Sequence, residues 1–139
     1  MIDANVRFFT DVKAPTKAHV DDAGIDLYAD ETVLLESGKS RVIRTGIGVT
    51  VPKGYCVVAY PRSSYNVEYG VFTTGLIDAN YTGEIKLRLY NFGTEDLWID
   101  NGSRFAQLVV HRLPKVRFLL DVGGTDEKRG SDGFGSSGR

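Results

Sequence analysis

The chain has 139 residues, enough for one domain with a single core, and its 17 Lys and Arg nearly balance its 18 Asp and Glu. A net charge of -1 provides no broad basic surface for duplex nucleic acid or for an anionic membrane, so neither partner is expected. The one cysteine, Cys56, excludes an internal disulfide, and the lack of a signal-peptide pattern or a long apolar run predicts a cytoplasmic protein.

Short segments in which apolar and polar residues alternate predict half-buried strands. The alternation occurs at residues 6–8, 47–51 and 85–89, and more continuous apolar runs at 55–60 and 108–110 predict strands of the core. Most of the 16 glycines and four prolines fall between such runs, where turns are expected. We therefore predict an all-β fold, a jelly roll that forms a barrel or a sandwich.

Three local features complete the predicted fold. Residues 63–69 favour a turn or two of helix, with no helical period elsewhere. Asn101-Gly102 predicts a two-residue hairpin turn that joins strands at 97–100 and 104–110. The last strand is expected to end near Val122, which gives a β domain at 1–122 and a flexible, Gly-rich C-terminal arm at 123–139.

Two segments place a carboxylate where chemistry is possible. In D-A-G-I-D-L (22–27), Asp26 lies between two apolar residues, so its carboxylate needs a partner. In G-L-I-D-A-N-Y-T-G-E (75–84), Asp78 follows an apolar pair and precedes a strand. Asp78 is therefore either a general base at the rim of the scaffold or a cap of the turn backbone.

Two further segments carry groups that suit an anion or a ligand. P-R-S-S (61–64) follows an apolar run, so backbone N–H groups, two hydroxyls and the Arg62 guanidinium gather at a strand end; the alternative is a surface turn. In R-F-A-Q-L (104–108), Gln107 lies inside an apolar strand, and its amide either locks the core or faces a ligand.

The C-terminal segment R-G-S-D-G-F-G-S-S-G (129–138) combines glycines with one arginine and one aromatic residue. The glycines allow close approach to a ligand, Arg129 offers a planar fork of donors to phosphate, and Phe134 offers a flat face to a ring. The segment is thus interpreted as a lid, against the alternative of a flexible terminus.

Taken together, and in this order, these five segments resemble the five motifs of the homotrimeric dUTPase family. The resemblance implies a jelly-roll subunit in a homotrimer whose active sites are shared between subunits. It implies hydrolysis of dUTP to dUMP and pyrophosphate with Mg²⁺, which keeps uracil out of DNA and supplies dUMP for dTMP synthesis. The arm at 123–139 would then close over the active site.

The resemblance also implies a role for each matching residue. Asp78 is the catalytic base that activates water for attack on the α-phosphorus, Tyr81 packs under the deoxyribose, and Asp26 lies near Mg²⁺ through water. The implied contacts to the α- and β-phosphates are Arg62, Ser63, the backbone of Ser64 and Gln107. The other implied substrate-binding residues are Arg129, Ser136 and Ser137 on the γ-phosphate, Phe134 on the uracil, and Gly75, Ile77 and Gly135.

The sequence departs from the usual family pattern at three positions, Ser64, Asn80 and Asp132, none of which removes a group with an assigned role. A dCTP deaminase would share the fold, but Tyr81 and Gly83 follow the dUTPase pattern. A second hypothesis, from another class, is a nucleotide-gated binding module in which a regulatory protein partner contacts the surface.

Overall fold

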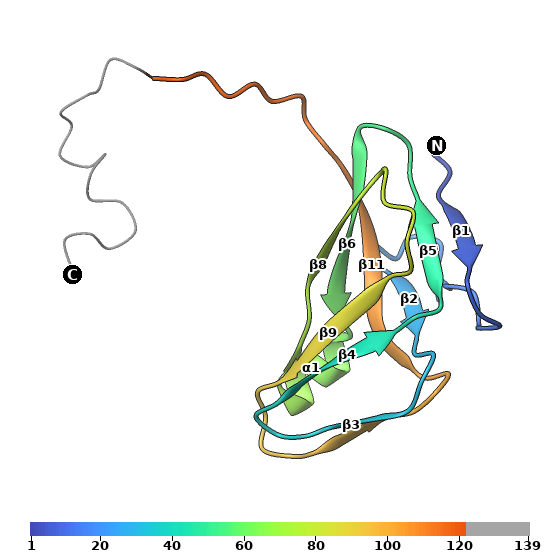
Figure 1. The fold of residues 1–139 in the computed structure, drawn as a ribbon, viewed down its shortest axis with the longest axis vertical. Coiled ribbons are helices and arrows are strands. Elements are labelled where there is room, and N and C mark those ends of the chain that lie inside the picture. Colours follow the sequence, from blue (N-terminus) through green and yellow to red (C-terminus); the bar gives the residue numbers. More distant parts are fainter. Residues whose placement is uncertain (122–139) are drawn as a thin grey trace.

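The structure, a computed structural model, describes residues 1–121 (Figure 1). In this part of the chain there are eleven strands and one short helix. In chain order they are β1 (Asn5–Phe8), β2 (Ile25–Tyr28), β3 (Val33–Leu35), β4 (Ser40–Arg44), β5 (Ile47–Thr50), β6 (Tyr55–Pro61), α1 (Ser63–Tyr69), β7 (Val71–Phe72), β8 (Gly75–Asp78), β9 (Lys86–Asn91), β10 (Leu97–Ile99) and β11 (Arg104–Arg112). The all-β prediction is confirmed.

The strands pair antiparallel in four groups. A four-stranded sheet has the order β2-β11-β6-β8, a three-stranded sheet the order β4-β9-β7, and β1-β5 and β10-β3 form pairs. β9 shows how the alternating pattern directs side chains, because Leu87, Leu89 and Asn91 are buried while Lys86, Arg88 and Tyr90 are exposed. The buried sides of the strands form one apolar core.

A buried polar side chain ties two of these groups together. The amide nitrogen of Asn91 donates to the carbonyl oxygens of Leu35 (3.0 Å) and Glu95 (2.7 Å), while its oxygen accepts from the Gly93 N–H (3.0 Å). Every polar atom of this amide is thereby satisfied, as burial requires. The end of β9 is thus fixed against β3.

Strand β6 matters most for the position of the candidate site. It runs between β11 and β8, with Cys56 opposite Asp78 at one end and Pro61 opposite Ala106 at the other. The chain passes directly from Pro61 through the extended Arg62 into α1, which ends at Gly70 in the left-handed region (φ 72°). The β5–β6 and β8–β9 connections therefore lie at one end of the molecule and α1 at the other (Figure 1).

One predicted connection is wrong. Asn101-Gly102 does form a turn, closed by a hydrogen bond from the Ser103 N–H to the Asp100 carbonyl (3.0 Å). The flanking strands do not form a hairpin, because β10 pairs with β3 whereas β11 pairs with β2 and β6. The helix at 63–69 is confirmed, and Cys56 is buried as its apolar neighbours predict.

The described chain ends in an exposed segment. After the Leu113 N–H donates to the Gly54 carbonyl (2.8 Å), residues 114–121 leave the body in an extended path (Figure 1). The prediction that the last strand ends near Val122 is wrong, because β11 ends at Arg112 and residues 113–121 form no strand. The domain boundary at 122 stays a prediction, because residues 122–139 lie outside the described part. Within residues 1–121 no helix is long and apolar enough to cross a bilayer.

Candidate active site

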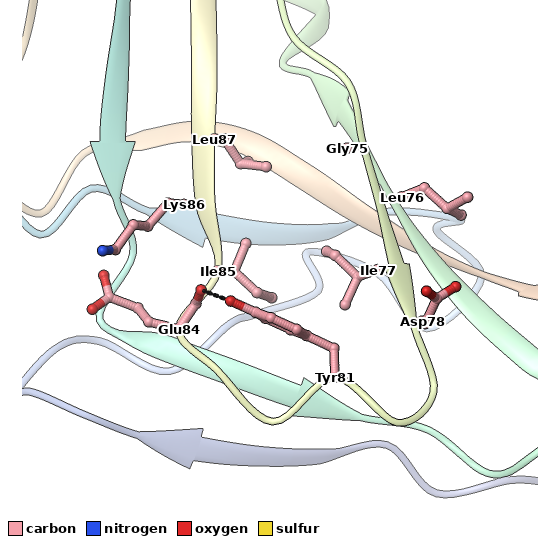
Figure 2. Close-up of a pocket in the computed structure, with 9 residues that line it drawn as sticks. All are labelled: Gly75, Leu76, Ile77, Asp78, Tyr81, Glu84, Ile85, Lys86 and Leu87. Carbon is pink, nitrogen blue, oxygen red and sulfur yellow. Dashed lines mark hydrogen bonds between the residues drawn. The ribbon is translucent and has the colours of Figure 1, made fainter.

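A hollow of about 210 Å³ lies between β8 and the beginning of β9, here called the β8–β9 hollow (Figure 2). Its lining includes four of the predicted site residues, Gly75, Ile77, Asp78 and Tyr81. β8 is an edge strand of its sheet, so its free edge can offer backbone donors and acceptors. A flat ring that carries its own donors and acceptors can therefore be recognised here by main-chain hydrogen bonds.

The Tyr81 ring is held in place within this hollow. Its hydroxyl donates to the Glu84 carbonyl oxygen (2.8 Å, Figure 2), and the Arg7 guanidinium donates to the Tyr81 carbonyl oxygen (3.2 Å). A Cβ added at Gly83 would lie 2.5 Å from the Tyr81 hydroxyl oxygen, so only glycine leaves room for this ring position. The ring thus forms a fixed wall.

Asp78 stands at the end of β8 with an exposed side chain. The Tyr81 N–H donates to the Asp78 carbonyl oxygen (3.1 Å), which closes the turn through the backbone. Figure 2 shows the carboxylate on the side of the strand opposite to Ile77. Among the described residues, no hydrogen bond or ion pair engages this carboxylate, so it is free to accept a proton from a bound water.

Glu84 is an anchor beneath the same hollow. The Arg44 guanidinium donates to both of its carboxylate oxygens (3.3 Å each), and the Gly46 N–H adds a third hydrogen bond (3.3 Å). Burial works against ionisation of Glu84, but these donors outweigh it, so the pKa of Glu84 lies below its ordinary value. The carboxylate is therefore a structural anion at neutral pH.

A second hollow, of about 470 Å³, lies where β6 meets α1 and is here called the β6–α1 hollow. Ser63 and Gln107 line it together with Gly24. The Gln107 amide nitrogen donates to the Pro61 carbonyl (3.0 Å), which orients the side chain across the strand. A Cβ at Gly24 would lie only 2.0 Å from the Gln107 amide oxygen, so the first motif and the fourth fit together through this glycine.

Arg62 and Ser64 lie beside this hollow and are not among the residues that line it. The Arg62 guanidinium is 5.2 Å from the centre of the Tyr65 ring and donates to the Arg104 carbonyl oxygen (3.4 Å). Ser64 belongs to the first turn of α1. Arg62 is therefore held at the strand end by a ring and a backbone oxygen, from which it can turn toward an anion.

Asp26 lies on the same side of the molecule, opposite Gln107 in the pairing of β2 with β11. Its carboxylate forms an ion pair with Arg104 (3.2 Å). No cluster of three or more metal-ligating side chains occurs in residues 1–121. A single carboxylate suits a hydrated Mg²⁺ that takes its other ligands from water and phosphate, and does not suit a metal held by protein alone.

The two hollows are far apart within one chain. Asp78 is level with Cys56 on β6, whereas Gln107 is level with Tyr60 and Arg62 follows Pro61. Five residues from Cys56 to Pro61 at about 3.3 Å each place the two ends roughly 17 Å apart. Asp78 and Arg62 of one chain are thus too distant to act on the same phosphoryl group.

The sequence analysis gave no role to Arg7, Arg44 or Glu84, which support the Tyr81 wall. Arg7 contacts Tyr81 from 74 positions away and Arg44 pairs with Glu84 from 40 positions away, so no local pattern signals these two contacts, whereas Glu84 accepts from Tyr81 only three positions away. The predicted residues Arg129, Phe134, Gly135, Ser136 and Ser137 lie outside the described part of the chain.

Comparison with known proteins gives consistent matches. The chain is 41% identical over 145 residues to the deoxyuridine 5'-triphosphate nucleotidohydrolase of Mycobacterium leprae, covering 97% of this chain and 94% of the relative. The enzyme of the same description from Thermobifida fusca is 38% identical over 136 residues, covering 95% of this chain and 76% of the relative.

Solved structures agree with the sequence matches. A dUTPase variant from phage phi11 of S. aureus, described with a structural Mg(II) ion, superposes with a TM-score of 0.80 at 25% identity, covering 90% of this chain and 99% of that one. A dUTPase variant of phage 80alpha gives 0.81 at 27% identity, covering 96% and 98%. These likenesses confirm the jelly-roll prediction. The family model described as dUTPase matches residues 10–138, so the chain belongs to the dUTPase family.

Proposed function

We propose that the protein hydrolyses dUTP to dUMP and pyrophosphate, which removes a source of uracil in DNA and supplies the precursor of dTMP. The observation that carries the proposal is the family match over residues 10–138, which includes all five motifs. The β8–β9 hollow supports the proposal because it offers three groups that the reaction needs. The edge strand β8 can bind the uracil, the Tyr81 ring can pack against the sugar, and the Asp78 carboxylate can accept a proton from water.

In this proposal the β8–β9 hollow holds the nucleoside. The free edge of β8 beside Gly75 and Ile77 reads the uracil through backbone groups. The Tyr81 ring lies under the deoxyribose and leaves no room for a 2′-hydroxyl, since its hydroxyl is fixed on the Glu84 carbonyl. Asp78 takes a proton from the water that attacks the α-phosphorus in line with the leaving pyrophosphate.

The β6–α1 hollow holds the phosphates in the same proposal. Ser63, the backbone of Ser64, Gln107 and Arg62 bind the α- and β-phosphates with donors aimed at developing negative charge. The separation of roughly 17 Å along β6 supports a site in which these donors come from a different copy than Asp78. We therefore propose a homotrimer with shared sites. Arg129, Ser136 and Ser137 add contacts to the γ-phosphate, and Phe134 and Gly135 cover the base.

Magnesium fits this arrangement through Asp26. Bound Mg²⁺ supplies charge neutralisation on the phosphate oxygens. Asp26, half-buried and oriented by Arg104, contacts the hydrated ion through a water, while Arg62 and Gln107 fix the phosphates around it. A carboxylate already paired with an arginine binds a hydrated ion by a hydrogen bond more readily than by direct ligation.

Pyrophosphate release with Mg²⁺ from dUTP, dTTP, dCTP and UTP at equal concentration tests the activity. Turnover confined to dUTP supports the reaction together with the selection of base and sugar. Ammonia released from dCTP would instead identify a deaminase. No turnover combined with tight dUTP binding would indicate the nucleotide-gated binding module, for which partner capture with and without dUTP is the next assay.

Mixing two inactive variants is expected to restore activity if sites are shared. Asp78→Asn and Arg62→Ala homotrimers, unfolded together and refolded, form mixed trimers in which an intact Asp78 meets an intact Arg62. We expect a substantial recovery of dUTP turnover over either variant alone. The double variant Asp78→Asn/Arg62→Ala mixed with wild type is the control for refolding. No recovery would place both groups of a site on one chain.

Gly24→Ala is expected to lower kcat/KM for dUTP by about tenfold or more, because even a displacement on the order of 1 Å is costly in a positioned site. The new Cβ would meet the Gln107 amide, whose position fixes the phosphates. Steady-state kinetics and a melting curve measure this. An unchanged kcat/KM would contradict the role of Gln107 in phosphate binding. A large fall in Tm would indicate a folding defect instead.

A further inference from the structure

The connection between β8 and β9 is held from outside by the β1-β5 pair. On β1, the Arg7 guanidinium donates to the Tyr81 carbonyl oxygen (3.2 Å). On β5, the Ile47 carbonyl oxygen accepts from the Ile85 N–H (2.7 Å). Between these two points the Tyr81 hydroxyl donates to the Glu84 carbonyl oxygen (2.8 Å, Figure 2). Because β1 and β5 pair with each other, one two-stranded unit fixes the segment that carries the Tyr81 ring.

Arg7 reaches the connection because the strand beside it carries no side chain at the crossing point. Arg7 is level with Gly48 in the pairing of β1 with β5. A Cβ at Gly48 would lie 2.7 Å from a guanidinium nitrogen of Arg7 and 2.6 Å from the Gly83 carbonyl oxygen, closer than a side chain tolerates. Gly48 therefore leaves the space in which the half-buried Arg7 side chain meets the connection.

The Arg7 guanidinium is oriented by neutral oxygens and not by a carboxylate. It donates to the Thr50 hydroxyl on β5 as well as to the Tyr81 carbonyl oxygen. Its buried Nε has no hydrogen-bond partner within residues 1–121, and no ion pair engages the group there. A buried donor left unpaired costs stability, and such costs are typical of functional sites. The contact with Tyr81 is thus a better explanation of Arg7 than stabilisation of the fold.

The position of the Tyr81 backbone decides where the ring lies. The far end of the ring is fixed, because its hydroxyl is bonded to the Glu84 carbonyl oxygen and packs against Gly83. The near end follows the backbone, which Arg7 holds through the carbonyl oxygen. Ribose differs from deoxyribose by one hydroxyl, so a ring displacement on the order of 1 Å is enough to weaken the exclusion of UTP. Arg7 is therefore connected to the sugar through Tyr81.

We propose that Arg7 is a positioning residue that sets the preference for deoxyribose over ribose, by holding the Tyr81 backbone and with it the ring. This inference rests on the proposed function for the place of Tyr81 against the sugar. It assigns a role in specificity to a residue outside all five motifs, the first of which begins at Asp22.

The first test compares Arg7→Met with wild type by the ratio of kcat/KM for dUTP to kcat/KM for UTP. We expect this ratio to fall at least about tenfold, chiefly through faster turnover of UTP, while kcat for dUTP stays within about threefold. A loss of folded enzyme lowers both values by the same factor and leaves the ratio unchanged. Arg41→Met is the matched control, because the exposed Arg41 guanidinium also donates to a backbone carbonyl, that of Leu34, and does not line the hollow.

Thr50→Val tests the same arrangement without removing a charge. Valine has nearly the shape of threonine but lacks the oxygen that orients the Arg7 guanidinium. We expect the ratio to fall in the same direction by roughly threefold, the scale of one hydrogen bond. Arg7→Lys keeps the charge but not the planar fork of donors, so its ratio should lie between those of wild type and Arg7→Met. A ratio for Arg7→Met equal to that of wild type overturns the proposal.

A binding measurement decides the inference without turnover. Calorimetry with the α,β-imido analogues of dUTP and UTP gives the ratio of their dissociation constants in wild type, Arg7→Met and Arg41→Met. A preference for the deoxy analogue that falls at least about tenfold in Arg7→Met alone supports the inference. The same ratio in all three proteins, or a wild type that binds the two analogues equally or not at all, overturns it. Pyrophosphate release is read separately, so a failure of hydrolysis and a failure of the role of Arg7 are told apart.

Discussion

Asp78→Asn is expected to lower kcat for dUTP by roughly 10²- to 10⁴-fold, the usual contribution of a positioned general base. The carboxylate is exposed at the end of a rigid strand and has no partner among the described residues, so its loss removes the proton acceptor without disturbing a structural contact. The amide of asparagine has nearly the same shape, so dUTP should still bind with little change.

Single-turnover and steady-state pyrophosphate release measure this effect, and sedimentation checks that the assembly persists. Asp100→Asn is the matched control, because Asp100 is also an exposed aspartate directly after a strand. Its kcat should equal that of wild type. A kcat for Asp78→Asn within threefold of wild type would contradict the role of Asp78 as the general base. Loss of the assembled state in sedimentation would instead indicate that Asp78 has a structural role.

Deletion of residues 123–139 is expected to leave folding intact and to lower kcat/KM for dUTP by about 10²-fold or more, the cost typical of losing donors aimed at developing charge. Within residues 1–121, the apolar core is formed by buried residues between 27 and 108, with partly buried residues packed on it from 12 to 110. The deleted segment carries the fifth motif, with Arg129 and Phe134 as its proposed substrate contacts.

Two comparisons separate the possible causes of this loss. The truncated protein should melt at the temperature of wild type in the absence of nucleotide. Within the full chain, Arg129→Ala should reproduce much of the defect, whereas Lys128→Ala, a neighbouring cation with no assigned role, should not. Full turnover by the truncated protein would show that the segment is dispensable for catalysis.

The long strands were predictable, and so were the short strands β1, β5 and β10, but other short strands were not. β6 and β11 have apolar runs of sufficient length to be recognised, and β9 has clear alternation. β2, β3 and β7, which have two to four residues, were not among the predicted strands. The Asn101-Gly102 turn was identifiable, but the partner of each flanking strand is decided by the packing of the core and not by the turn.

The sequence was similarly informative about residue types and uninformative about their separation. Asp78 and Arg62 were recognisable because a carboxylate and a guanidinium stand at the ends of apolar runs, and Gln107 because its amide lies inside an apolar strand. That Asp78 lies at one hollow while Gln107 lines the other, with Arg62 beside it, follows from the register of β6 with β8 and β11, which no local pattern encodes. The support of Tyr81 by Arg7 is likewise a long-range contact, whereas its hydrogen bond to the Glu84 carbonyl spans only three positions.

Because one β6 strand has Asp78 level with one end and Arg62 just past the other, each subunit of a shared-site ring belongs to two different catalytic centres. A subunit in which both Asp78 and Arg62 are replaced therefore inactivates both centres to which it contributes, even when the neighbouring subunits are intact. Co-expression of such a chain with the intact one would suppress activity beyond simple dilution. In the proposed shared-site ring, such a lesion is therefore expected to inactivate a larger share of the centres than its share of the subunits.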